Sequence, residues 1–232
     1  MNRKRIFSSV LFFGLFSNLP QAHAGLILSE VMYDPVSADD SYEWVELFNN
    51  SASTIDLSNY SLGWGGSDYT YGTMQLSGSI TSGSYFVVGG PLSGVTNGSP
   101  LFDLALDFNP GLQNGGTQSD GVALFDMTSD LITAVTVPID AVIYDLDGNL
   151  AGLMGSDGLP ALPMVGDAAS GYSIERLNLA GDWDIQSAPT AGYGPLMYEQ
   201  VATVPIPSTL LLFVPGLMSL LGVQKFSRRQ PS

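Results

Sequence analysis

The sequence contains no cysteine and a single histidine, His23. It has only seven Lys and Arg residues but 22 Asp and Glu residues. Without cysteine the chain forms neither disulfides nor thiolate metal sites. Between residues 25 and 203 there is also no histidine and no lysine. A Ser-His-Asp triad, a histidine-ligated zinc ion and a Schiff-base lysine are therefore excluded from that segment. Carboxylates, hydroxyls and aromatic rings remain, so glycoside chemistry with two carboxylates stays open.

The charges are divided unevenly along the chain. All 22 carboxylates lie between residues 25 and 203, where Arg176 is the only basic residue, so this segment carries a formal charge of −21 against −15 for the whole chain. Binding to nucleic acid or anionic lipid depends on Lys and Arg that neutralise phosphates. The charge of this segment therefore excludes nucleic acid as a partner.

The first 24 residues have the three parts of a secretory signal peptide. Residues 1–5 are basic, residues 6–16 are apolar, and Ala22 and Ala24 are the small residues that signal peptidase requires. The apolar part is too short for a stable membrane-spanning helix, which needs about 20 residues. We therefore predict a signal helix that is removed by cleavage between Ala24 and Gly25.

The C-terminal segment 204–232 has a similar order of parts. A proline-containing tag is followed by an apolar run over 208–223 and then by Lys225, Arg228 and Arg229. The apolar run predicts a short hydrophobic helix that reaches a membrane, and the basic residues after it would stay on the cytoplasmic side. The tag consists of Val204, Pro205, Ile206 and Pro207.

This arrangement resembles the PEP-CTERM sorting signals that exosortases read. Ile206 stands where glutamate is usual, so the tag is closer to the VPLPA-type variant, although Ser208 replaces the usual alanine. The resemblance implies an exosortase-like enzyme as a partner. An ordinary C-terminal membrane helix is the alternative, and both interpretations place the end of the chain at a membrane.

The segment between the two ends reads as short strands separated by turn residues, which is typical of an all-β sandwich. We predict one domain over residues 25–195 and a spacer over 196–203. No sustained helical periodicity occurs in this segment. A Gly-, Pro- and Asp-rich stretch over 145–170 predicts a long loop. The expected strands are 26–33, 42–48, 69–76, 84–88, 121–125, 139–144 and 172–177, and the segment 55–62 leads into a strand.

Several of these segments resemble bacterial lamin tail domains. The opening motifs are LSEVMYDP at 28–35, YEWVELFN at 42–49 and IDLSNYSL at 55–62, and the closing stretch contains YSIERL at 172–177 and APTAG at 188–192. The resemblance spans roughly residues 26–195 and implies an immunoglobulin-like β-sandwich without a disulfide. The family has no shared catalytic residues, so none is carried over. The stretch 133–170 is longer than the family pattern.

Two groups of carboxylates are candidate calcium ligands, because Ca²⁺ prefers six to eight oxygen ligands. One group lies at the first two strands, and the other is Asp145-Leu-Asp-Gly-Asn149, which resembles the start of a calcium loop. The alternatives are a solvated acidic surface and a simple Gly-Asn turn. The candidate ligands are Glu30, Asp34, Glu43, Asp145 and Asp147.

Aromatic residues are the other candidates for ligand binding, since their rings could stack on sugars beside Asp acceptors. Trp44 and Trp183 lie in strand-like motifs and are expected in the core. Trp64, which glycines flank on both sides, is the Trp we consider for the surface, and that question stays open from the sequence. The tyrosines considered with it are Tyr60, Tyr69 and Tyr71.

Together these features predict an exported, surface-anchored and non-enzymatic protein of the cell envelope or extracellular polysaccharide matrix. Signal peptidase, an exosortase-like enzyme, a membrane and extracellular polysaccharide are the expected partners, and no cofactor is required. The alternative is a glycan hydrolase that uses carboxylates, or a calcium-dependent carbohydrate-binding module.

Overall fold

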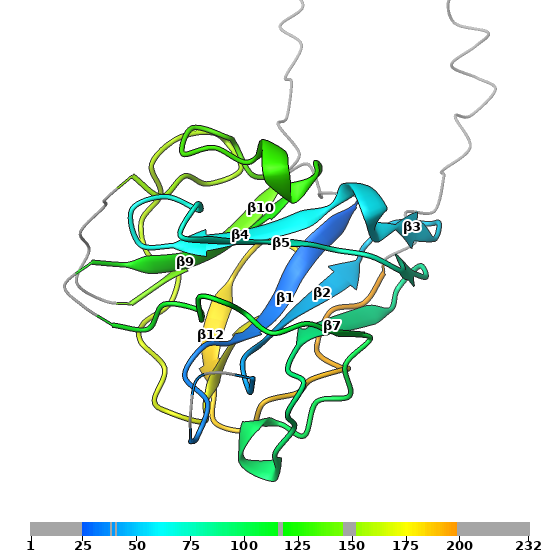
Figure 1. Cartoon of the computed structure of the whole chain (residues 1–232). Helices are drawn as coiled ribbons and strands as arrows, with labels where there is room; N and C mark the ends of the chain where they lie inside the picture. Colours follow the sequence, from blue (N-terminus) through cyan, green and yellow to red (C-terminus); the bar gives the residue numbers. More distant parts are fainter. Residues whose placement is uncertain (1–24, 38, 40, 116–117, 146–151, 199–232) are drawn as a thin grey trace, which may run out of the picture. The chain divides into compact units, whose positions relative to one another are not determined.

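The computed structural model describes residues 25–37, 39, 41–115, 118–145 and 152–198 (Figure 1). The chain divides into two compact units, 1–198 and 199–232, and all described residues belong to the first. The predicted signal peptide and the sorting segment 204–232 lie outside the described residues. In the described part, no helix has the length and apolar character needed to cross a membrane.

The described residues form an all-β fold, as predicted, with two larger sheets. The first has the order β12-β11-β1-β2-β7-β8, and all its pairs are antiparallel except β7 with β8. Its strands are β1 (Leu26–Met32), β2 (Trp44–Asn49), β7 (Tyr85–Gly89), β8 (Leu104–Ala105), β11 (Ser173–Arg176) and β12 (Trp183–Gln186).

The second sheet is antiparallel and has the order β10-β9-β4-β5. Its strands are β4 (Ser61–Gly65), β5 (Gly72–Gln75), β9 (Asp120–Phe125) and β10 (Asp140–Tyr144). A small pair, β3 (Ile55–Asp56) and β6 (Ser79–Ile80), stands apart from both sheets. Three single 3-10 turns complete the elements: η1 (Leu57–Asn59), η2 (Val95–Asn97) and η3 (Ser129–Leu131).

The two larger sheets enclose one hydrophobic core, which makes the fold a β-sandwich. Both layers contribute alternate residues, such as Val45 from β2 and Val122 from β9. Tyr33 and Tyr144 stack across the core with ring centroids 4.1 Å apart. A bulge between Leu28 and Glu30 shifts the alternation of β1, so that Leu28 and Val31 both face the core.

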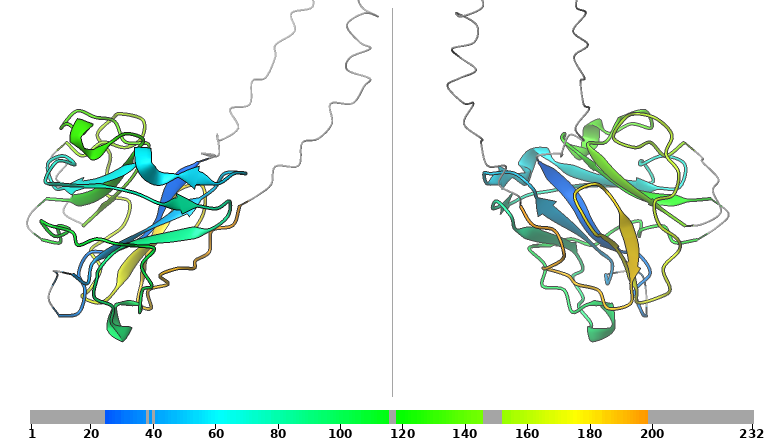
Figure 2. Two further views of the ribbon diagram at one scale, coloured as in Figure 1. Left: turned by 45° about the vertical axis from the view of Figure 1, so that its right-hand side comes forward. Right: turned by 180° about the vertical axis from the view of Figure 1, so that it is seen from behind.

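The outer face of the six-stranded sheet is also covered, which explains why every residue of β1 and β2 is buried. The cover is the segment 187–198, which we call the strap, and it runs along the sheet after β12 (Figure 2). Its Leu196 packs with Ile27 and Phe48, and its Ala191 lies against a cluster that includes Trp44. The strap therefore gives this sheet a second apolar interface.

The structure adds three details that the sequence did not settle. Residues 55–62 are not one strand, because the Asp56 side chain accepts a hydrogen bond from Ser58 N and begins the turn η1. Strand β12 was not predicted. Trp64, whose position the sequence left open, is 1% exposed and packs edge-on against Phe108, and Trp44 and Trp183 are buried as expected.

Candidate functional site

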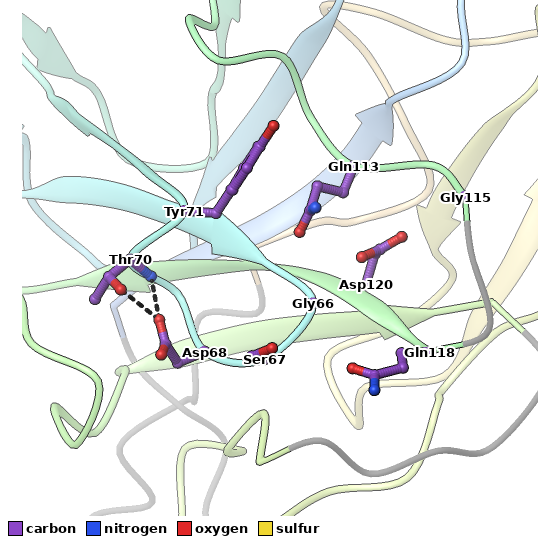
Figure 3. A pocket seen from close by; sticks show the side chains of 9 residues that line it. All are labelled: Gly66, Ser67, Asp68, Thr70, Tyr71, Gln113, Gly115, Gln118 and Asp120. Carbon is purple, nitrogen blue, oxygen red and sulfur yellow. Dashed lines mark hydrogen bonds between the residues drawn. The ribbon is translucent and has the colours of Figure 1, made fainter.

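A pocket of about 410 Å³ opens at one end of the four-stranded sheet (Figure 3). Because β4 pairs antiparallel with both β5 and β9, the end of β4 lies beside the starts of those two strands. The β4–β5 loop forms one wall and the chain leading into β9 forms the other. The lining residues are Gly66, Ser67, Asp68, Thr70, Tyr71, Gln113, Gly115, Gln118 and Asp120.

The β4–β5 loop is held in shape by its own side chains. Asp68 Oδ1 accepts hydrogen bonds from the backbone N–H and the hydroxyl of Thr70, at 2.8 and 2.5 Å. Tyr69 points inward, is 3% exposed, and donates its hydroxyl to Met154 O at 2.9 Å. Tyr71 points the other way, with 53% of its surface exposed at the pocket.

A glycine allows the two walls to approach each other. A Cβ atom on Gly66 would lie 2.7 Å from Asp120 Oδ1 and 3.4 Å from Gln113 Oε1. The first distance is shorter than real Cβ contacts allow, so a side chain at this position would displace Asp120. Gly66 is thus required for the position of the carboxyl group in the pocket wall.

Asp120, the first residue of β9, is the buried acid of this pocket, which we call the Asp120 pocket. Its side chain is 2% exposed, it accepts a hydrogen bond from the backbone N–H of Gly115, and its Oδ2 has no hydrogen-bond partner. Burial raises the pKa of Asp120 to about 6, and the charges of Asp145 and Asp167 add to this effect. At neutral pH the group is mainly ionised, and one oxygen remains available as an acceptor.

A second group of buried acids lies beneath the strap. Glu30 on β1 is directly opposite Glu46 on β2 and Glu175 on β11, so the three side chains form a row across adjacent strands. We call this set the glutamate row. All three residues are buried, with exposed fractions of 0%, 1% and 6% respectively.

The strap places hydrogen-bonding groups against each member of the glutamate row. Thr190 donates its backbone N–H to Glu30 at 3.0 Å, and Gly192 donates its N–H to Glu46 at 2.5 Å. The Thr190 hydroxyl lies 2.7 Å from Glu30 Oε2 and 2.9 Å from Glu175 Oε1. From the sheet, Ser173 donates to Glu30 and Ser29 donates to Glu46.

Burial raises the pKa of every acid in the row. It raises the pKa of Glu30 to about 7 and that of Glu46 to about 8, in both cases against the lowering effect of the hydrogen bonds just described. The pKa of Glu175 is also raised by burial. At neutral pH the row therefore retains protons that exposed glutamates would have lost, which limits the repulsion among its members.

The sequence-predicted calcium ligands occupy different parts of the fold. Glu30 belongs to the glutamate row, whereas Glu43 accepts a hydrogen bond from Leu112 N at 3.0 Å. Asp34 lies just beyond β1, Asp145 just beyond β10, and Asp147 lies outside the described residues. Among the residues that the structure describes, no group of three potential ligands could hold a metal ion. Calcium binding stays a prediction.

Arg176, the only basic residue between 25 and 203, makes contacts within the fold. Its Nη2 lies 2.6 Å from Asp140 Oδ2, its Nε donates to Leu28 O at 2.8 Å, and its guanidinium lies 5.0 Å from the centre of the Trp183 ring. These contacts join β11, β1, β10 and β12. The cation is therefore engaged away from the Asp120 pocket.

The family model of the Lamin Tail Domain matches residues 20–138, which is just over half of the chain. The chain belongs to the lamin tail domain family. The all-β fold with several sheets is consistent with the immunoglobulin-like sandwich implied by the sequence resemblance. No curated protein matches the chain.

A crystal structure of a DUF4876 family protein from Bacteroides thetaiotaomicron is among the solved structures that match this chain. The two are 14% identical with a TM-score of 0.38, and the match covers 79% of this chain and 75% of the other.

In this lamin tail domain, the opening and closing sequence motifs meet at the glutamate row. Glu30 comes from the motif 28–35, Glu46 from 42–49, Glu175 from 172–177, and Thr190 and Gly192 from 188–192. Residues up to 160 positions apart in the sequence are thus joined by hydrogen bonds. This position gives the acidic residues of the motifs a physical role in attaching the strap.

The sequence prediction did not identify Asp120 as a site residue. It directly precedes the expected strand 121–125, and only the fold shows that its carboxyl group lies beside Gly66 of the β4–β5 loop. The glycines at 63, 65 and 66 and the Gly-Asn-rich chain before β9 were the available signals, since close backbone approach requires glycine. Tyr71 was considered as a sugar-stacking residue, and it does line the pocket.

Proposed function

We propose that this protein is an exported, non-enzymatic binding or structural protein, anchored at the cell surface, in the envelope or the extracellular polysaccharide matrix. Signal peptidase would release the mature chain at Gly25. Residues 204–207 would then direct an exosortase-like enzyme to the C-terminal segment, which holds the protein at the membrane. The sequence of the two ends supports these steps.

The observation that carries the non-enzymatic assignment is the state of the acids in the described fold. The glutamate row is covered by the strap and filled with protein hydrogen bonds, and Asp140 is paired with Arg176. With no histidine, lysine or cysteine between 25 and 203, Asp120 and Asp68 are the only acids in the one pocket described above. Membership of the lamin tail domain family agrees with a binding or structural role.

The test is mass spectrometry of both ends of the protein after cell fractionation. We expect it in the envelope or outside the cell, with Gly25 as its first residue and without an intact C-terminus at Ser232. Replacing Ala24 by Trp should leave an uncleaved precursor. Recovery from the cytoplasm with Met1 attached would contradict export, and a mature chain that still ends at Ser232 would leave only the membrane-helix alternative.

A glycan hydrolase is the second candidate, because the Asp120 pocket contains two carboxylates and the pKa of Asp120 is raised toward that of a general acid. Against it, Asp68 Oδ1 is engaged in the loop by Thr70. A hydrolase would release new reducing ends from a polysaccharide, and both Asp120→Asn and Asp68→Asn would abolish that release. A binding protein would release none in any form.

A further inference from the structure

We propose that the Asp120 pocket is a saccharide-binding site for a sugar unit that carries hydroxyl or amino groups and no acidic group. The inference rests on the proposed function, since a surface-anchored protein meets polysaccharide. It deepens that function by naming the site and the ligand class. Three properties of the pocket carry it: an unmatched acceptor, an exposed aromatic ring and the absence of cations.

The unmatched acceptor is Asp120 Oδ2. A buried polar atom without a hydrogen-bond partner costs free energy, and a ligand that supplies a donor compensates this cost. The backbone N–H of Gly115 also interacts with the Asp120 carboxyl group and lowers its pKa. A hydroxyl or an ammonium group of a sugar is the donor that this position requires.

The aromatic ring is that of Tyr71. It stands on one side of the pocket with Thr70 and Asp68, while Gln113, Asp120 and Gln118 lie on the other side (Figure 3). A sugar ring has an apolar face and polar edges, so it can pack against an exposed aromatic ring while its hydroxyls reach hydrogen-bonding groups. The Gln113 and Gln118 amides supply both donors and acceptors for those hydroxyls.

The charge of the site selects against acidic sugars. No lysine or arginine lines the pocket, and the only cation between residues 25 and 203, Arg176, is paired with Asp140. A uronic acid, sulfate or phosphate group would meet Asp120 and Asp68 without a compensating charge. Neutral sugars avoid this repulsion, and amino sugars gain attraction.

The test is saturation-transfer NMR on the full chain, in which signal passes from the protein to a bound sugar. The probes are glucose, galactose, mannose, glucosamine and galactosamine, with glucuronate and galacturonate as acidic counterparts. We expect transfer to at least one neutral or amino sugar and none to the acids. Tyr71→Ala should weaken the affinity for that sugar at least fivefold, by removing the stacking surface.

Asp120→Asn should weaken it about tenfold or more. The substitution replaces one carboxylate oxygen, which accepts hydrogen bonds, by an NH₂ group, which donates them. Two matched variants should keep the affinity within about twofold: Tyr193→Ala, which removes a tyrosine that is 64% exposed on the strap, and Asp130→Asn, which removes an exposed acid at η3.

Three results would overturn the proposal. They are no saturation transfer to any neutral or amino sugar, transfer to the uronic acids as strong as to the neutral sugars, or unchanged sugar affinity in both Tyr71→Ala and Asp120→Asn. These failures are distinct from failure of the proposed function. A protein that is exported and processed but binds no sugar would lose the saccharide site and keep its proposed location. Cytoplasmic retention would contradict the location, whatever the sugars show.

Discussion

The Asp120 pocket and the glutamate row place the same chemical group in opposite situations. Both contain buried carboxyl groups whose pKa is raised by burial. In the row, hydrogen bonds from the sheet and the strap reach the acids, and the strap closes over them. In the pocket wall, Asp120 keeps one buried oxygen without a hydrogen-bond partner. The difference suggests that the row holds the fold together and that the pocket meets a ligand.

The largest expected effect is the response of the glutamate row to pH. The folded pKa values of Glu30 and Glu46, about 7 and 8, lie above the usual 4.5. Between pH 4.5 and 8 the folded protein therefore holds protons that the unfolded chain has released, so stability is lost as pH rises. The loss should be on the order of 3 kcal/mol for each group, measured by denaturant unfolding from pH 5 to pH 9.

General self-repulsion of a domain with a charge of −21 also favours low pH, so this prediction needs a control. Glu46→Gln should flatten the pH dependence, because the amide does not ionise under the strap. Asp130→Asn removes the same charge from an exposed position and should leave the slope nearly unchanged. Equal slopes in the two variants would show that the glutamate row does not dominate the pH response.

The next effect concerns the attachment of the strap. Thr190→Val keeps the shape of the side chain but removes the hydroxyl that lies between Glu30 and Glu175. We expect a loss of about 1–3 kcal/mol, because buried acceptors lose a donor, together with faster proteolysis within 187–198. Thr54→Val, at an exposed position, is the control and should change neither quantity.

Asp120→Asn should have the opposite sign. The folded pKa of Asp120, about 6, lies above the usual 3.8, so the ionised group costs stability as pH rises through this range. At pH 7.5 the uncharged amide should raise the free energy of unfolding by about 1–2 kcal/mol. A destabilised variant at this pH would indicate that the Asp120 carboxylate supports the fold.

Much of the sandwich was predictable because its physical signals are local. Short runs rich in apolar residues at 84–88 and 121–125, the motif at 172–177 and the turn residues between them were sufficient to place those strands. The turn η1 before β4 depends on one hydrogen bond that the Asp56 side chain accepts from Ser58. The burial of Trp64 depends on Phe108, which is 44 positions away in the sequence. Such distant contacts leave no pattern in a single sequence.

The same distinction applies to the site. Tyr71 was a candidate from its residue type alone, but the pairing of Asp120 with the β4–β5 loop results from the strand order β9-β4-β5. The acidic group at the first two strands was visible in the sequence, and Glu30 was named as a candidate calcium ligand, with a solvated surface as the alternative. The burial of Glu30 and Glu46 comes from the strap, whose Thr190 and Gly192 lie 160 and 146 positions later in the sequence.

The smallest expected effect is that of calcium. If the acids outside the row only repel one another, calcium, magnesium and sodium at matched ionic strength should raise the melting temperature equally. A true oxygen site would respond to calcium alone, and at ten times its dissociation constant it would add about 1.4 kcal/mol. We expect equal shifts in thermal melts of the full chain, and a shift specific to calcium would support the candidates outside the row, Asp34, Glu43, Asp145 and Asp147.

The most direct test of the account compares Asp120→Asn and Glu46→Gln in one experiment at pH 7.5, with sugar affinity and thermal stability both measured. Each substitution removes one buried carboxylate. The account predicts that both variants become more stable, that Asp120→Asn loses at least tenfold in affinity, and that Glu46→Gln binds the sugar like the parent protein. Full sugar binding by Asp120→Asn, or equal loss in both variants, would contradict it.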